Sequence, residues 1–205
     1  MEGEKKKDGG TRRAIVVGPW GGNGGTSWDD GSYSGVRTIT LVYDRCIDSI
    51  RVEYDKSGKP VLAEKHGGNG GNHTTTIKLQ YPEEFLTTVS GHYSPVVHGG
   101  TPVIRSLTFK SNQGSFGPFG VEEGMPFSFP MDGGSIIGFW GRNGWYLDAI
   151  GFRLSRTHAP TLLRRVSLKL QKLGERSKSL VAPRNGEDST ANNNSNRAAI
   201  RKRNA

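Results

Sequence analysis

The sequence contains almost no cysteine and no long apolar stretch. Its 205 residues include one cysteine, Cys46, so no disulfide can form within the chain, and this usage fits a reducing compartment. No apolar run approaches the ~20 residues that a membrane-spanning helix requires. The charged segment from Met1 to Asp8 is followed by no apolar core, so it does not resemble a secretory signal. These absences predict a soluble protein of the cytoplasm or the nucleus.

The sequence also lacks the residue groups that metal sites and catalytic sites need. The five histidines are scattered, with no His/Cys/Asp spacing that would hold zinc. Two close pairs of acids, Asp44 with Asp48 and Glu122 with Glu123, have the residue types of acid–base catalysis. Nothing in their surroundings distinguishes them from solvated charges. We therefore predict no catalytic residues, no cofactor and no metal.

Positive charge is concentrated at the two ends of the chain. The formal net charge is +9, yet residues 15–154 hold eleven Lys/Arg against thirteen Asp/Glu, a net charge of −2. Residues 155–205 hold twelve Lys/Arg against three acids. Such a basic tail leaves binding of nucleic acid or of a protein partner as an alternative function. The tail has no interleaved aromatic residues, which argues against nucleic acid.

Three segments differ in composition. Residues 1–14 are polar and rich in Gly and Lys, which predicts a disordered arm. Residues 15–154 show short alternating runs broken by glycine, which predicts an all-β domain. Residues 155–205 form a basic extension, in which 161–173 has the spacing of an amphipathic helix and the remainder the composition of a disordered tail. The alternation places these side chains on shared strand faces: Ile39, Leu41 and Tyr43; Ile50, Val52 and Tyr54; Ile77, Leu79 and Tyr81; Ile150, Phe152 and Leu154.

One glycine loop occurs twice, as Trp20-Gly-Gly-Asn-Gly-Gly25 and as His66-Gly-Gly-Asn-Gly-Gly71. Clustered glycines let backbone N–H groups approach a ligand closely. The later segment Gly144-Trp-Tyr-Leu-Asp148 supplies a carboxylate, which accepts strong hydrogen bonds from hydroxyl groups. No Gly-Lys-Ser/Thr follows either loop, so neither matches a phosphate-binding loop. The combination favours a polyhydroxylated ligand, that is, a sugar.

Five segments resemble, in the same order, the motifs of the jacalin-related lectins of plants. The resemblance implies an all-β fold, a β-prism of three four-stranded Greek-key sheets related by pseudo-threefold symmetry, which explains the recurring glycine loop. The five segments are Val17–Gly25, Trp28–Gly31, Val103–Phe109, Phe116–Gly120 and Gly138–Gly151.

The resemblance also implies a sugar site between the first glycine loop and the G-x-x-x-D loop. Carried over to this chain, its residues are Gly25, Trp145, Tyr146 and Asp148. Galactose-binding members are typically cut after the glycine loop, whereas the segment 21–28 is continuous here, as in the uncut mannose binders. We therefore predict a mannose/glucose-binding lectin without catalysis. Its implied partners are glycans or glycoproteins and a second copy of the chain, in a homodimer or higher homo-oligomer that binds multivalently.

A second sugar site is implied by the second glycine loop, because some relatives use this sheet as well. Its candidate residues are Gly71, Cys46, Ile47 and Asp48. The first glycine of the G-x-x-x-D motif is replaced by Asp44, and aspartate tolerates a positive φ less freely than glycine does.

The third repeat, near residues 90–95 and Gly120, has no acid in the corresponding turn, so we predict no sugar site there. Trp20 and Trp140 fall within strand patterns and are assigned to the core. Trp28 lies beside the first glycine loop and fits either the core or the site.

Overall fold

A computed structural model describes residues 14–130 and 134–156. The chain divides into two units, Met1–Ala159 and Pro160–Ala205, and every described residue belongs to the first. The predicted helix over 161–173 and the basic tail lie outside the described residues, as does the predicted arm up to residue 13.

The described part of the chain consists of twelve strands joined by turns and loops. No helix in it is long and apolar enough to cross a membrane. The strands are β1 (Ile15–Gly21), β2 (Thr26–Asp29), β3 (Gly35–Tyr43), β4 (Ile47–Lys56), β5 (Lys59–Gly67), β6 (His73–Lys78), β7 (Leu86–Pro95), β8 (Pro102–Ser111), β9 (Ser115–Gly120), β10 (Met125–Pro130), β11 (Gly134–Asn143) and β12 (Leu147–Arg156).

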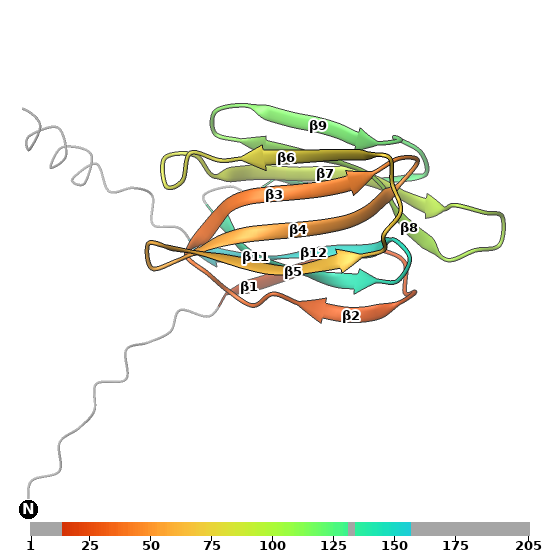
Figure 1. Cartoon of the computed structure of the whole chain (residues 1–205), viewed down its shortest axis with the longest axis horizontal. Coiled ribbons are helices and arrows are strands. Elements are labelled where there is room, and N and C mark those ends of the chain that lie inside the picture. The colour runs from red at the N-terminus through yellow and green to blue at the C-terminus, as the bar shows by residue number, and fades with distance from the viewer. Residues whose placement is uncertain (1–13, 131–133, 157–205) are drawn as a thin grey trace, which may run out of the picture. The chain divides into compact units, whose positions relative to one another are not determined.

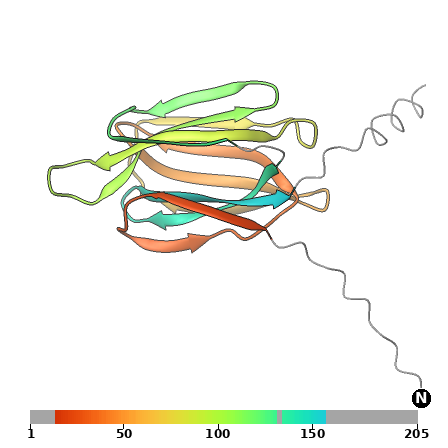
Figure 2. The ribbon, with the colours of Figure 1, turned by 180° about the vertical axis from the view of Figure 1, so that it is seen from behind.

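These strands form three four-stranded antiparallel sheets, as the prism fold requires (Figure 1). Each sheet has a hairpin at its centre and two outer strands: β3–β4 lies between β5 and β6, β7–β8 between β10 and β9, and β11–β12 between β1 and β2. The last sheet therefore joins the first two strands to the last two, and Figure 2 shows this pairing from behind. This closure brings residues more than one hundred positions apart into one sheet.

The register of the three central hairpins repeats along the chain. In each, the pairing shifts near the end of the first strand: between Val42 and Tyr43, between His92 and Tyr93, and between Arg142 and Asn143. The three shifts lie fifty residues apart. A bulge bends its strand and redirects the turn that follows. The repeated bulges thus give all three hairpin turns related geometry, in agreement with the predicted pseudo-threefold symmetry.

The core lies between the sheets and is built from the alternating faces of the central strands. The faces predicted on β3, β4 and β12 are buried: Ile39, Leu41, Ile50, Tyr54 and Phe152 have no exposed surface. Tyr43 and Tyr81 are only partly buried. Trp20 of β1 stacks on Phe127 of β10, with ring centroids 5.5 Å apart, and so connects two sheets. Each fully buried apolar side chain of this core stabilises the fold by about 1.5–3 kcal/mol.

Candidate functional site

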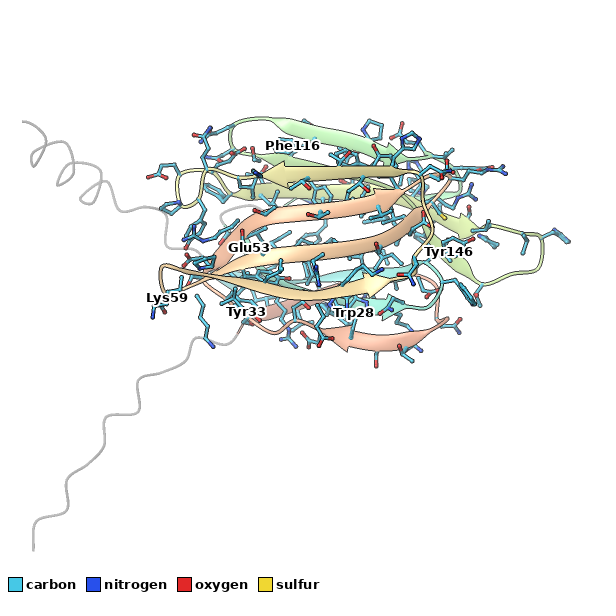
Figure 3. All side chains as sticks on the ribbon, in the orientation of Figure 1. Trp28, Tyr33, Glu53, Lys59, Phe116 and Tyr146 are labelled. Atoms are coloured by element: carbon cyan, nitrogen blue, oxygen red, sulfur yellow. The ribbon has the colours of Figure 1, made fainter. Side chains whose placement is uncertain are left out.

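The first glycine loop joins the outer strands β1 and β2 and passes over the turn of the central hairpin β11–β12. The Gly22 N–H donates to the Asp148 carbonyl oxygen at 2.8 Å, which fixes the loop against this turn. Within the turn, the Gly144 N–H donates to the Tyr146 carbonyl at 3.0 Å. Figure 3 shows Tyr146 at the opposite end of the domain from Lys59, which begins β5. The two predicted sugar-binding segments thus meet at one end of the prism.

The Asp148 carboxylate is buried without a full set of partners. The residue is 6% exposed, and its Oδ2 atom has no hydrogen-bond partner. Burial raises the pKa of Asp148, against the opposing effects of the Gly144 N–H and the Arg142 charge. A buried acceptor without a partner costs about 1–3 kcal/mol, so such an atom indicates a place for a ligand donor.

Backbone geometry at the first loop depends on glycine at position 25. Gly25 has a φ of +58°, and a Cβ there would lie 2.2 Å from the Asn143 carbonyl oxygen and 2.7 Å from Asp148 Oδ2. Arg142 holds the same loop: its Nε donates to the Gly24 carbonyl at 2.8 Å and its Nη2 to the Gly25 carbonyl at 2.7 Å. This role of Arg142 was not predicted from the sequence, although the residue lies two positions before the G-x-x-x-D motif.

The second repeat reproduces this arrangement between the β5–β6 loop and the β3–β4 turn. The Gly68 N–H donates to the Asp48 carbonyl at 2.9 Å, and the Asp44 N–H to the Cys46 carbonyl at 3.1 Å. Asp48 is 4% exposed, and its Oδ2 also lacks a partner. Burial, and then the charge of Asp44, raise the pKa of Asp48. Lys65 Nζ supports the loop by donating to the Gly68 carbonyl at 2.9 Å.

The replacement of glycine by Asp44 carries no backbone penalty. Among the described residues other than glycine, Ser57 alone has a positive φ, and Gly144 is not among the glycines with a positive φ. The equivalent positions in both repeats therefore accept an L-amino acid. The Asp44 side chain is exposed and accepts a hydrogen bond from Asn72 Nδ2 at 2.8 Å.

The register refines the candidate residues of the second site. Ile47 pairs with Tyr43 as Leu147 pairs with Asn143, and both Ile47 and Leu147 are fully buried. Arg45 and Cys46 are therefore the counterparts of Trp145 and Tyr146, and the Ile47 side chain belongs to the core. The Cys46 side chain is also buried, which raises the pKa of its thiol to about 11 and keeps it protonated.

The third repeat has an arginine where the other two have the carboxylate. The Val121 N–H donates to the Arg105 carbonyl at 2.9 Å, which makes Arg105 the counterpart of Asp48 and Asp148. Arg105 is 4% exposed, and its Nη2 lies 2.5 Å from Glu123 Oε2 in the β9–β10 loop. The turn of the third repeat thus offers an arginine in place of an acid, and the absence of a sugar site there stays a prediction. Glu123 is 61% exposed and pairs with the buried arginine, so it has a structural role beyond that of a solvated charge.

Arg105 also contacts the turn of one neighbouring hairpin and the end of β7, the strand that pairs with its own strand β8. Its Nε donates to the Arg45 carbonyl at 2.9 Å, in the turn that carries Asp48. Its Nη1 donates to the Pro95 carbonyl at 3.1 Å, where β7 ends. Local spacing does not reveal the role of Arg105, because its partners lie elsewhere in the chain. The one signal in the sequence is an Arg at the position where the other two repeats have Asp.

One cavity of about 900 Å³ takes in most of the predicted site residues. All four residues of the first site, Gly25, Trp145, Tyr146 and Asp148, line it. From the second site, Asp48 lines it directly, and Gly71 lies beside the Asp48 carboxylate, since a Cβ on Gly71 would be 2.8 Å from Oδ2. Gly71, Cys46 and Ile47 are not themselves among the lining residues. No group of three or more metal-ligating side chains occurs within the described ranges.

Trp28 packs in the structure rather than lining the cavity. Its ring stacks on His66, with centroids 3.8 Å apart, and His66 Nε2 lies 2.7 Å from Asp30 Oδ1. The Tyr54 hydroxyl donates to the other oxygen of Asp30 at 2.6 Å. His66 directly precedes the second glycine loop, so this network fixes that loop to the β2 side of the domain (Figure 3).

A three-sheet prism with glycine loops set against buried aspartates defines the fold and site of a carbohydrate-binding protein. Comparison with known families agrees, because residues 17–153 match the model of the jacalin-like lectin domain. The chain belongs to this family, whose members are lectins, proteins that bind carbohydrate without converting it.

Three relatives illustrate the match. The chain is similar to "Jacalin-related lectin 19" of Arabidopsis thaliana, with 60% identity over 82% of this chain and 95% of that protein. It is 43% identical to a "Galactose-specific lectin" of Morus indica over 71% of this chain and 95% of the relative. A mannose-specific jacalin-related lectin from Morus nigra, solved in complex with mannose, superposes with a TM-score of 0.67. The two sequences are 48% identical, and the match covers 73% of this chain and 99% of the Morus nigra chain.

Proposed function

We propose that this lectin binds mannose/glucose-type glycans at Asp148 and the first glycine loop. The observation that carries the proposal is the Oδ2 atom of Asp148, which is buried, has no partner and belongs to a residue lining a cavity. A carboxylate is an acceptor only, and adjacent sugar hydroxyls are donors. The Asp148 carboxylate accepts from two neighbouring hydroxyls, such as the 4-OH and 6-OH of a hexose. The backbone N–H groups of Gly25, Trp145 and Tyr146 donate to sugar oxygens.

The preference for mannose rests on the continuous glycine loop and on the structural likeness to a mannose-specific lectin. Calorimetry of the full chain tests it directly, with methyl α-mannoside as the ligand and methyl α-galactoside as the matched control. We expect a dissociation constant on the order of 0.1–1 mM for the mannoside, as few contacts can form in an open site. Stronger binding of the galactoside would overturn the assignment of specificity.

The second site, at Asp48 and the loop 67–71, binds the same class of sugar. It presents the same buried, partnerless carboxylate oxygen as the first site. We expect methyl α-mannoside to bind with a stoichiometry near two per chain, falling to one in the Asp48→Ala protein. Asp44→Ala, in the same turn but exposed, is the control and should keep two sites. A stoichiometry of one in the unaltered protein would exclude the second site.

Sugar affinity is expected to fall as the pH falls, because a protonated carboxyl loses acceptor capacity. Burial raises the pKa of both aspartates, so the loss begins at a higher pH than for an exposed aspartate, whose pKa is about 3.9. The second site should be lost first, since the Asp44 charge adds to the effect of burial on the Asp48 pKa, whereas Arg142 opposes it at Asp148. Calorimetry between pH 7 and pH 4 measures both losses. Constant affinity down to pH 4 would contradict this assignment.

The protein functions multivalently, as a homodimer or a larger homo-oligomer. Strand β1 lies at the edge of the sheet β1-β12-β11-β2. Its residues Ile15 and Val16 are 42% and 48% exposed. Apolar side chains on an outer strand suit pairing with a second copy. We expect light scattering of the full chain to give at least twice the 22.3 kDa monomer mass. Replacing both residues with lysine should reduce it to one copy, and a monomeric unaltered protein would refute the assembly.

A further inference from the structure

The two proposed sugar sites open into the same cavity. Its lining includes the carboxylate and glycine loop of each site: Asp148 with Gly25, and Asp48 with Gly70. Its volume of about 900 Å³ lies at the upper end of the range for small-molecule sites, about 300–1,000 Å³. Both carboxylates are more than nine-tenths buried, and each has an oxygen without a partner. Two separate acceptor groups therefore face the same open cavity.

Trp145 lies at the junction of the two sites. Its backbone belongs to the turn of the first site, yet its carbonyl oxygen abuts the second glycine loop, since a Cβ on Gly68 would lie 2.1 Å from it. Only glycine at position 68 permits this approach. The loop of the second site and the turn of the first are thus in direct contact.

The Trp145 side chain is 87% exposed and lines the cavity. Such exposure is unusual for a large aromatic residue, because burying its surface is favourable. An aromatic face of this kind packs well against the apolar C–H face of a pyranose ring. Val96 and Val97 of the β7–β8 loop line the same cavity and are 37% and 67% exposed, which extends its apolar wall.

We propose that the two sites hold one glycan together, an oligomannoside with one mannose unit at each aspartate and the intervening units against Trp145. The inference rests on the proposed function of both sites. Once the first unit is bound, the second site meets an effective concentration in the millimolar range. The gain is the ratio of this effective concentration to the single-site constant. Roughly 1–10 mM against a constant at the tight end of the expected range, about 0.1 mM, gives the oligosaccharide a gain of roughly 10–100-fold over the monosaccharide.

The test is calorimetry of the full chain with methyl α-mannoside and with a branched mannopentaose. We expect two monosaccharides per chain but one pentasaccharide, bound roughly 10–100-fold more tightly. In the Asp48→Ala protein, pentasaccharide affinity should fall to the monosaccharide level while Asp148 still binds methyl α-mannoside. Two pentasaccharides per chain, or tight binding that survives Asp48→Ala, would overturn the shared site.

A side-chain variant and a mass measurement complete the test. Trp145→Ala removes the side chain but keeps the backbone N–H donor, so it should weaken binding of the pentasaccharide more than binding of the monosaccharide. Leu62→Ala is the control: Leu62 is 60% exposed and lies outside the cavity lining, so its replacement should change neither affinity. Light scattering should show no growth in mass with the pentasaccharide, and growth would mean bridging between molecules and refute the proposal. If methyl α-mannoside does not bind at all, the proposed sugar-binding function is wrong. If methyl α-mannoside binds at two sites but two pentasaccharides also bind per chain, only the shared site is wrong.

Discussion

The Asp148→Ala protein is expected to lose the first sugar site while it remains folded. The substitution removes the carboxylate that accepts hydrogen bonds from two sugar hydroxyls. Both hydroxyls would then have no acceptor in the complex. We expect a loss of about 1.5–3 kcal/mol, which is roughly 10–150-fold in affinity. Calorimetry with methyl α-mannoside should then find one site per chain, the one at Asp48. Unchanged affinity at two sites would show that the sugar binds elsewhere.

The stability of the Asp148→Asn protein provides the control. Because burial raises the folded-state pKa of Asp148 above the unfolded value, protonation stabilises the fold. This stabilisation is complete below the unfolded pKa of about 3.9 and is lost as the pH rises through the folded value. The ionised form therefore costs stability at pH 7. We expect the unfolding midpoint of the asparagine variant at pH 7 to equal or exceed that of the unaltered protein, whereas a large decrease would indicate a structural role for the carboxylate.

The Arg105→Met protein is expected to be strongly destabilised. Arg105 is 5% exposed at its side chain and donates to two backbone carbonyls, those of Arg45 and Pro95, as well as to Glu123. Methionine fills similar space but donates no hydrogen bond, so the part-buried contacts to the Arg45 and Pro95 carbonyls are lost. We expect a loss of about 2–4 kcal/mol, which lowers the unfolding midpoint by roughly 10 °C. Calorimetric or optical melting of the full chain measures the shift.

Two variants separate the contributions around Arg105. Glu123→Gln keeps an acceptor and leaves the carbonyl contacts intact, and Glu123 is 61% exposed, so its cost should stay near 1 kcal/mol or below. Glu122→Gln, the exposed neighbour, should have no effect. If Arg105→Met melts within 1–2 °C of the unaltered protein, Arg105 does not hold the neighbouring turns together. If it is stable but binds one sugar instead of two, the arginine acts mainly on the turn that carries Asp48.

Much of the fold was predictable because apolar residues alternate with polar ones along the strands, and this alternation marks the buried face of each strand. Ile39 and Leu41, or Ile150 and Phe152, are two residues apart and point to the same side of the sheet. The glycine loops and the motif ending in Asp148 were also recognisable, since each is a short local pattern. The geometry that joins them was not local, and it came from the resemblance to a family with a known arrangement.

The features that sequence reasoning missed depend on contacts between distant strands. Arg105 meets Arg45 across sixty residues, and Arg142 meets Gly24 across 118. No periodicity records such contacts, because they exist only once the three hairpins lie side by side. The same holds for Gly68 against Trp145, the contact that puts both carboxylates on one cavity. The departure at Asp44 does not strain the backbone, because the glycine at the equivalent position in the first site does not use a positive φ.

A crystal structure of the full chain with methyl α-mannoside would show directly whether the sugar binds at the two aspartates. We expect a sugar in contact with Gly25 and Tyr146, with two of its hydroxyl oxygens within about 3 Å of the Asp148 carboxylate. A second molecule should occupy the equivalent position at Asp48. If the mannoside binds away from both aspartates, at a concentration that saturates the protein in solution, neither aspartate forms the sugar site.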